Sequence, residues 1–226
     1  MMAYHARILS SSFRKCPIAF LYIFLIAYLA GSIPSSLWLG KIFYGLDIRQ
    51  RGSGNAGASN TYRILGWKAG LLVLCFDIAK GALPTFYATQ LFPASDAPVF
   101  LQILAATAAV LGHCFTCFAR FRGGKGVATA LGAFMILFPI GVPICLIVFA
   151  VTLALTRYIS LASMMAVAFL PIVEAVLILA LDHPVHPALF VLSLLLVPFI
   201  LFMHRSNISR LLAGTETPVK PQKKKL

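Results

Sequence analysis

The sequence predicts an all-α, polytopic integral membrane protein, and three observations lead to that class. Of its 226 residues, 60% are hydrophobic and only 11% are charged, and the mean hydropathy is +0.92. Soluble domains are roughly 45–50% apolar, so this chain departs strongly from them. The apolar residues form runs of membrane length, and cations lie at the ends of those runs. Together these features predict one helical membrane domain.

Seven apolar segments divide the chain, at residues 18–44, 68–92, 98–118, 127–139, 141–156, 159–180 and 186–203. A helix that spans a bilayer needs roughly 20 residues, so the fourth and fifth segments are short. Pro139, Gly141 and Pro143 separate these two, which favours a turn over one long helix. The fourth segment also suits a re-entrant helix. We therefore expect about seven transmembrane or partly spanning helices.

Charge predicts the orientation of these helices. Arg and Lys gather in residues 47–68, in residues 119–126 and in the C-terminal stretch from Arg205, whereas the connections near 93–97, 140–143 and 181–187 carry none. Cytoplasmic loops are enriched in Arg and Lys. Seven segments place all three basic stretches on one face, with the N-terminus outside and the C-terminus in the cytoplasm. Arg7, Arg14 and Lys15 then lie on the opposite side, which is an exception to the rule.

The ends of the chain complete the predicted organisation. Residues 1–17 resemble the basic start of a signal peptide, but the apolar run that follows is too long, so we interpret it as a retained first helix. Residues 1–216 are expected to form a single domain with active-site loops at 47–67, 119–129 and 204–216. Residues 217–226 are expected to be a basic, disordered tail on the anionic leaflet.

The net charge of +13 does not indicate a nucleic-acid-binding protein. Such proteins do not bury most of their chain in apolar runs, and cations at the ends of apolar segments match anionic lipid headgroups instead. We expect membrane lipids as partners and no nucleic acid. Cys114 and Cys117 have a CxxC spacing but no second pair, so buried small hydrophobes are favoured over a metal or redox site.

The loop at 47–67, called the first loop, concentrates glycine and hydrogen-bond donors. It contains GSGNAGASNTYR, from Gly52 to Arg63, in which Ser53 and Asn60 add neutral polar groups. Glycines allow backbone N–H groups to turn toward an anion, and the Arg63 guanidinium can hold a phosphate with two hydrogen bonds. The alternative is a flexible loop with a solvated charge. We favour an anion site beside the membrane helices.

The loop at 119–129, called the second loop, has the same character. Gly123, Gly124, Lys125 and Gly126 stand immediately before an apolar helix pattern. Free N–H groups at a helix N-terminus bind anions, and Lys125 adds a point charge. The order of residues does not fit a Walker A motif, so it does not indicate nucleotide hydrolysis. The alternative is a positively charged turn without a ligand.

The stretch at 204–216, called the third segment, places His204 and Asn207 on one helical face, where they can orient or polarise a carbonyl. A helix-end histidine is more often a cap. Asp77 and Lys80 are three residues apart within an apolar segment and are interpreted as an internal ion pair near the site, whereas Glu174 has no evident partner. The sequence contains no HxxxxD, GxSxG or HExxH motif, so its chemistry must proceed without a strong protein base or a metal.

These three motifs together resemble the bacterial membrane acyl-phosphate:glycerol-3-phosphate acyltransferase family of the PlsY type. The family pattern GSGNxGAxNxxR is similar to residues 52–63, GHxxPxFxxFxGGKGVAT to residues 112–129, and HxxNIxRLxxxxE to residues 204–216. The resemblance covers residues 28–216. Thr116 stands where the family has proline, which affects the local turn.

The resemblance implies transfer of a fatty acyl group from acyl phosphate to the 1-hydroxyl of glycerol 3-phosphate, giving lysophosphatidic acid and phosphate. It implies no cofactor or metal, a bacterial inner-membrane location, and an upstream enzyme that forms the acyl phosphate. The implied substrate-binding residues are Ser53, Asn60, Arg63, Gly123, Gly124, Lys125, Gly126 and Ser160. His204 and Asn207 would be catalytic, with either His204 or the donor's phosphate acting as the base.

Two other classes of protein share part of this pattern. A transporter for an organophosphate anion would also place cations near glycines, but its path needs cations that are accessible from both faces. The predicted outer connections at 93–97, 140–143 and 181–187 carry none. A non-catalytic membrane scaffold would explain the apolar segments but not the chemistry of the loops. We therefore expect an enzyme.

Overall fold

The computed structural model describes residues 17–93, 95 and 97–219, and all of its regular elements in those ranges are helical. Arg7, Arg14 and Lys15 lie outside the described residues, as does most of the predicted tail, 220–226. The α-helices are α2 (Pro17–Ser32), α3 (Ser35–Tyr44), α4 (Ala58–Leu65), α5 (Trp67–Leu91), α6 (Pro98–Cys114), α7 (Val127–Leu137), α8 (Gly141–Thr156), α9 (Ile159–Ala180), α10 (Pro187–Met203) and α11 (Arg205–Leu212). Two short 3₁₀ helices cover Ile48–Gln50 and Cys117–Ala119.

The predicted all-α class is confirmed, and each apolar segment contains a helix. The first segment is broken between α2 and α3, because Pro34 lacks the N–H group that would continue the helix. The fourth and fifth segments are separate helices, α7 and α8. Within the described residues, four helical stretches are long and apolar enough to cross a bilayer, and the number is five if the bent pair α10–α11 counts as one span. The count of seven spanning or partly spanning helices stays a prediction.

Close approach of helix backbones holds one half of the bundle together. A Cβ on Gly81 of α5 would lie 2.0 Å from the Thr129 carbonyl oxygen of α7, and one on Gly132 of α7 would lie 2.0 Å from that of Ile78. Small residues bring helices this close in membranes, where van der Waals contact replaces the hydrophobic driving force. The α5–α7 contact therefore fixes where α7 begins, and with it the second loop.

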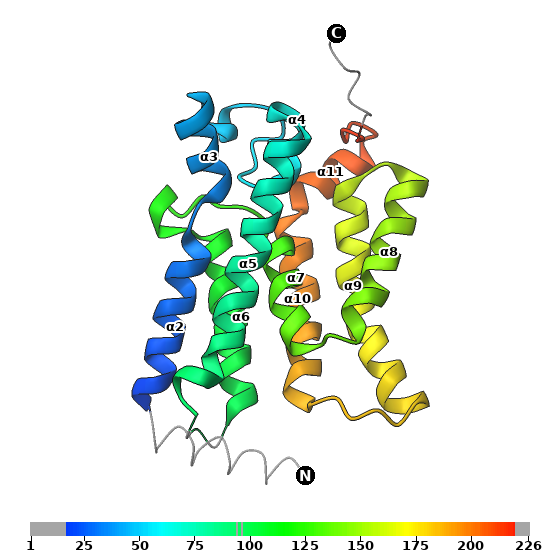
Figure 1. Cartoon of the computed structure of the whole chain (residues 1–226). Coiled ribbons are helices and arrows are strands. Elements are labelled where there is room, and N and C mark those ends of the chain that lie inside the picture. Colours follow the sequence, from blue (N-terminus) through cyan, green and yellow to red (C-terminus); the bar gives the residue numbers. More distant parts are fainter. Residues whose placement is uncertain (1–16, 94, 96, 220–226) are drawn as a thin grey trace.

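The two ends of the bundle differ in character. Figure 1 shows α4, α11 and the α8–α9 connection at one end, while the α5–α6 and α9–α10 connections lie at the other. The end that carries α4 and α11 also holds the basic loops, so we call it the polar end. Between the two ends, α7 to α10 enclose a core that includes Phe134, Leu170 and Ile200. Apolar side chains such as Ile147 and Leu155 of α8 point outward, which suits contact with lipid.

Candidate active site

A cavity of about 600 Å³ runs from the polar end into the helix bundle. Its polar part is lined by Ser53, Asn60, Arg63, Lys125, Gly126, Ser160, His204, Asn207 and Glu216, with Asp77 and His113 beneath them. Its deeper part is lined by apolar residues of α7, α8, α9 and α10, among them Phe134, Val142, Leu170 and Leu196. A cavity of this size and shape fits an elongated ligand with one polar end and one apolar end.

Asn60 holds the first loop in shape. It is only 1% exposed, and its side-chain amide donates to the carbonyl oxygens of Ile48, Arg51 and Asn55 at 3.1 Å each. Its Oδ1 accepts the backbone N–H of Ser53 at 2.9 Å. The polar atoms of Asn60 are therefore committed to the loop itself, although the residue also lines the cavity.

Arg63 presents an incompletely paired cation to the cavity. One terminal nitrogen donates to the Thr217 carbonyl oxygen at 2.8 Å, while Nε is buried and has no hydrogen-bond partner among the described residues. Burial, and secondarily the charge of Arg210, lowers the pKa of Arg63, while Glu216 opposes that shift. An anion that accepts two hydrogen bonds strongly stabilises a partly buried guanidinium whose donors are not all paired.

The glycines of the second loop serve close packing against the end of α6. Gly123 N–H donates to the Cys114 carbonyl and Gly124 N–H donates to the His113 carbonyl, both at 3.1 Å. A Cβ on Gly123 would lie 1.9 Å from the His113 carbonyl oxygen, and one on Gly124 would lie 2.1 Å from His113 Nε2. These two N–H groups are therefore not free to bind an anion. Gly126 adopts a left-handed conformation, with φ of 87°, and begins α7.

Residues at two helix N-termini line the cavity. Gly57 and Ala58 at the start of α4 line it, as do Gly126 and Val127 at the start of α7. The first N–H groups of a helix have no partner within that helix and carry a partial positive charge. The two loops thus aim two helix starts, together with Arg63 and Lys125, at the same space.

A chain of polar contacts joins the second loop, the third segment and α9. Lys125 Nζ donates to Asn207 Oδ1, and the Asn207 amide donates to Glu216 Oε1 at 2.8 Å. Ser160 Oγ also donates to Glu216 Oε1, at 2.8 Å, and Arg210 Nε donates to Oε2 at 2.7 Å. Burial alone would raise the pKa of Glu216, but these donors outweigh it and hold the pKa below its usual range.

The site carries an excess of positive charge. Arg63, Lys125 and Arg210 influence one another electrostatically, and Glu216 is the carboxylate that acts on them. Burial first, and then repulsion from Arg210, lowers the pKa of Lys125 to about 8. An ammonium held this way regains favourable energy when a phosphate group enters, because the new negative charge stabilises its protonated form.

His204 is neutral and has a defined orientation. It is 3% exposed, and Nδ1 lies 2.9 Å from the Ile200 carbonyl oxygen. Because a carbonyl only accepts, Nδ1 carries the proton and Nε2 presents a lone pair. Burial and the nearby charge of Lys125 lower the pKa of His204 to about 4, against smaller opposing effects of the Ile200 bond and Glu216. Its ring therefore stays uncharged at neutral pH.

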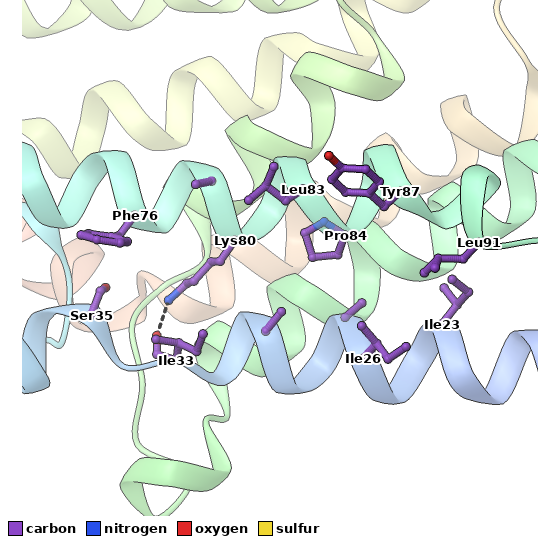
Figure 2. Close-up of a pocket in the computed structure, with 13 residues that line it drawn as sticks. Ile23, Ile26, Ile33, Ser35, Phe76, Lys80, Leu83, Pro84, Tyr87 and Leu91 are labelled. Atoms are coloured by element: carbon purple, nitrogen blue, oxygen red, sulfur yellow. Dashed lines mark hydrogen bonds between the residues drawn. The ribbon is translucent and has the colours of Figure 1, made fainter.

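The predicted ion pair of Asp77 and Lys80 is present beneath the site. Lys80 Nζ lies 2.8 Å from Asp77 Oδ1, which also accepts a hydrogen bond of 2.6 Å from Ser35 Oγ. Lys80 further donates to the Ile33 carbonyl at the break between α2 and α3, as Figure 2 shows. His113 Nδ1 stands 3.6 Å from Asp77, beyond hydrogen-bond length. These contacts join α3 and the α2–α3 break to α5 under the two loops.

The structure brings all ten predicted site residues to the polar end, but their contacts differ. Arg63, Lys125 and His204 present charges or a lone pair to the cavity, whereas Asn60, Asn207 and Ser160 bond to neighbouring protein groups. Sequence reasoning did not single out Glu216, which joins 204–216 to α9. Its presence at the end of the third motif was the available signal. Thr217 and Val219 also bond to the rest of the protein, through Arg63 and the Arg157 carbonyl.

Comparison with known proteins agrees with this geometry. The family described as glycerol-3-phosphate acyltransferase matches residues 21–214. A glycerol-3-phosphate acyltransferase of Fusobacterium nucleatum is 42% identical over 89% of this chain and 99% of its own length. One from Trichlorobacter lovleyi is 46% identical over 86% of this chain and 94% of its own.

Two crystal structures share the fold. Both are of PlsY (YgiH), described as an integral membrane glycerol 3-phosphate acyltransferase. Its glycerol 3-phosphate form has a TM-score of 0.78 and 34% identity, covering 89% of this chain and 96% of that one. Its lysophosphatidic acid form has a TM-score of 0.76 and 33% identity, over 89% and 95% of the two chains. The resemblance of the three motifs is confirmed, and this multi-pass membrane protein belongs to the glycerol-3-phosphate acyltransferase family.

Proposed function

We propose that this acyltransferase, an enzyme of phospholipid synthesis, moves a fatty acyl group from acyl phosphate to the 1-hydroxyl of glycerol 3-phosphate. The observation that carries the proposal is the division of one cavity into a cationic mouth and an apolar interior. Lysophosphatidic acid, the product, has the same division between a phosphate and a fatty chain. Relatives in this family carry the name of the acceptor, and one was crystallised with the acceptor and with the product.

The phosphate of glycerol 3-phosphate would bind between Arg63, Lys125 and the N-termini of α4 and α7. Arg63 Nε has no hydrogen-bond partner in the part of the chain that the structure describes, and Lys125 is a desolvated ammonium, so a dianion would stabilise the charge of each. Asn60 and the three glycines Gly123, Gly124 and Gly126 would act by shaping the loops, since their polar groups or their space are taken by protein contacts. Ser53 offers its hydroxyl at the rim of the same cavity.

The fatty chain would lie in the apolar part of the cavity, between α7, α8 and α9. Phe134, Val142, Val167 and Leu170 are among the residues that line this part. The reacting carbonyl then sits where this part meets the polar part, close to His204 and Ser160. The apolar walls hold the acyl group at a fixed distance from the acceptor's hydroxyl, so positioning supplies much of the rate.

In the reaction, the hydroxyl oxygen of glycerol 3-phosphate attacks the carbonyl carbon of the acyl phosphate. The bond between that carbon and the bridging oxygen breaks, phosphate leaves, and the hydroxyl proton passes to the departing phosphate. A base with a pKa near 4 is weak at neutral pH, so His204 is better suited to accept a hydrogen bond and orient the hydroxyl. Asn207 would hold Lys125 in place.

This choice between two bases has a direct test. If the substrate phosphate is the base, a phosphate with a second pKa of about 6 should set the acidic limb of the rate profile. His204→Gln should then lower kcat but leave that limb near the same pH, as measured by initial rates across a pH series. Loss or displacement of the limb in His204→Gln would instead assign the proton transfer to His204.

The proposed location is the bacterial cytoplasmic membrane, with the polar end facing the cytoplasm, where glycerol 3-phosphate is dissolved. The clustering of basic loops at that end supports the orientation. Single cysteines in a cysteine-free background test it, because one at position 122 should react with an impermeant thiol reagent only from the cytoplasmic side. Acyl phosphate is a reactive mixed anhydride, so an enzyme that forms it should act upstream.

The activity itself is tested with purified protein in detergent or liposomes. Phosphate release should require both acyl phosphate and glycerol 3-phosphate, and acyl-CoA should not replace acyl phosphate. Activity with acyl-CoA alone would overturn the assigned donor while leaving the acceptor intact. Release that is independent of glycerol 3-phosphate would show hydrolysis and overturn the transfer.

A further inference from the structure

A carboxyl group is buried in the apolar half of the bundle, away from the loops. Glu174 of α9 and Ser193 of α10 are both 0% exposed, and Ser193 Oγ donates to Glu174 Oε2. Glu174 Oε1 is buried without a hydrogen-bond partner among the described residues. Burying a polar atom in this way costs free energy, and such groups inside membrane helices often serve function.

This pair lies directly beneath the cavity. Leu170 and Leu196 are the cavity-lining residues of α9 and α10 that stand farthest from the polar end. Glu174 follows Leu170 by four residues and Ser193 precedes Leu196 by three, so each lies one helical turn deeper on the same face. Because α9 and α10 run in opposite directions (Figure 1), both turns point away from the loops and the two side chains meet below the cavity.

The pair lies deeper in the bundle than one leaflet of a bilayer extends. Ser160, at the polar end of α9, and Glu174 are separated by 174 − 160 = 14 residues, or about 21 Å along the helix. One leaflet contributes about 15 Å, half of the roughly 30 Å hydrocarbon core. Glu174 therefore lies about 6 Å deeper than one leaflet extends, so only a long, extended acyl chain held in the cavity meets the pair.

We infer that Glu174 and Ser193 form the floor of the acyl-chain cavity and set the longest chain that the enzyme accepts. Contact between the methyl end of the acyl chain and Leu170, Leu196 and Val142 stabilises the bound chain. Contact with a fixed polar pair destabilises it. The hydrogen bond between α9 and α10 keeps the floor from opening. This inference rests on the proposed placement of the fatty chain.

The test measures which chain lengths bind, independently of the acyl donor. Lysophosphatidic acids with saturated chains of graded length compete for the purified protein, and native mass spectrometry gives the bound fraction of each. Glu174→Ala removes the floor, so the preferred chain should lengthen by roughly two methylenes, with about a tenfold change in the ratio of long to original chain. Glu174→Gln keeps the shape and should retain the original preference.

Two further variants separate a floor from general loosening. Ser193→Val removes the hydrogen bond that keeps the floor from opening and should also shift the preference toward longer chains, so it tests the floor if Glu174→Ala does not fold. Leu177→Ala empties a buried position one turn below the pair and should lower stability without a shift. An unchanged preference in folded Glu174→Ala and Ser193→Val, or an equal shift in Leu177→Ala, would overturn the inference. Failure of acyl phosphate as a donor would contradict the proposed function but not this binding pattern.

Discussion

The first and second loops look alike in sequence but are built on different principles. In the first loop, the buried side chain of Asn60 holds the loop backbone in place by hydrogen bonds, and the glycines leave room for these bonds. In the second loop, Gly123 and Gly124 press directly against the backbone and ring of His113. Glycine-rich, basic loops therefore need not be backbone anion nests. Here Arg63, Lys125 and the starts of α4 and α7 line the cavity, while Asn60, Gly123 and Gly124 make the packing and hydrogen-bond contacts that shape the loops.

The largest expected difference between the loops concerns added side chains. A Cβ on Gly123 would overlap a backbone oxygen at 1.9 Å, whereas one on Gly54 meets nothing closer than 3.4 Å. Gly123→Ala should cost about 3 kcal/mol and lower the apparent Tm by roughly 6–12 °C. Gly54→Ala should cost about 1 kcal/mol, because its φ of +72° disfavours a side chain. Thermal unfolding in detergent compares them, and equal losses would refute the packing role of the second loop.

The next contrast concerns the cations that the loops carry. Removing Arg63 or Lys125 should raise the KM for glycerol 3-phosphate by about 10- to 100-fold, since each loses a charge-assisted contact to phosphate. Arg51 and Arg122 are exposed cations of the same two loops that do not line the cavity. Arg51→Ala and Arg122→Ala should therefore leave KM within about twofold. Initial rates at varied acceptor concentration give these values, and similar effects in all four variants would indicate a diffuse field instead of a site.

A smaller effect is expected at Asn60, where the structure suggests support without direct binding. Asn60→Ala leaves the Ser53 N–H and several loop carbonyls without their partner, which should lower stability by about 2 kcal/mol. Asn60→Asp keeps the oxygen that accepts the Ser53 N–H but loses the amide N–H donors. Its stability therefore shows how much the donated bonds contribute apart from the accepted one. If Asn60→Ala is as stable as the original protein but has a raised KM, Asn60 binds substrate directly.

The difference between loop sequence and loop structure shows where sequence reasoning stops. Helix positions were predictable because apolar runs and the turn around Pro139 and Pro143 are local features. Pro34, at the break between α2 and α3, is a local feature of the same kind. Contacts such as Lys125 with Asn207, 82 residues apart, or Ser193 with Glu174 depend on tertiary packing that no local pattern encodes. The sequence thus indicated which residues share the site, but not whether each faces the ligand or its neighbours.

The smallest expected effect separates the two cations by pH. Lys125 has a pKa lowered to about 8, so it is charged below pH 8 and loses its proton as pH rises above it, whereas Arg63 stays charged. The KM for glycerol 3-phosphate should rise about tenfold between pH 7 and 9, because only about one Lys125 in ten is protonated at pH 9. The substrate phosphate, with a second pKa of about 6, does not titrate in that window. Lys125→Arg should abolish the rise even if its KM at pH 7 is higher, because an arginine keeps its charge but not the compact ammonium. The same rise of KM with pH in Lys125→Arg would show that a group other than Lys125 titrates. The second loop would then bind glycerol 3-phosphate more through the N-terminus of α7 than through Lys125.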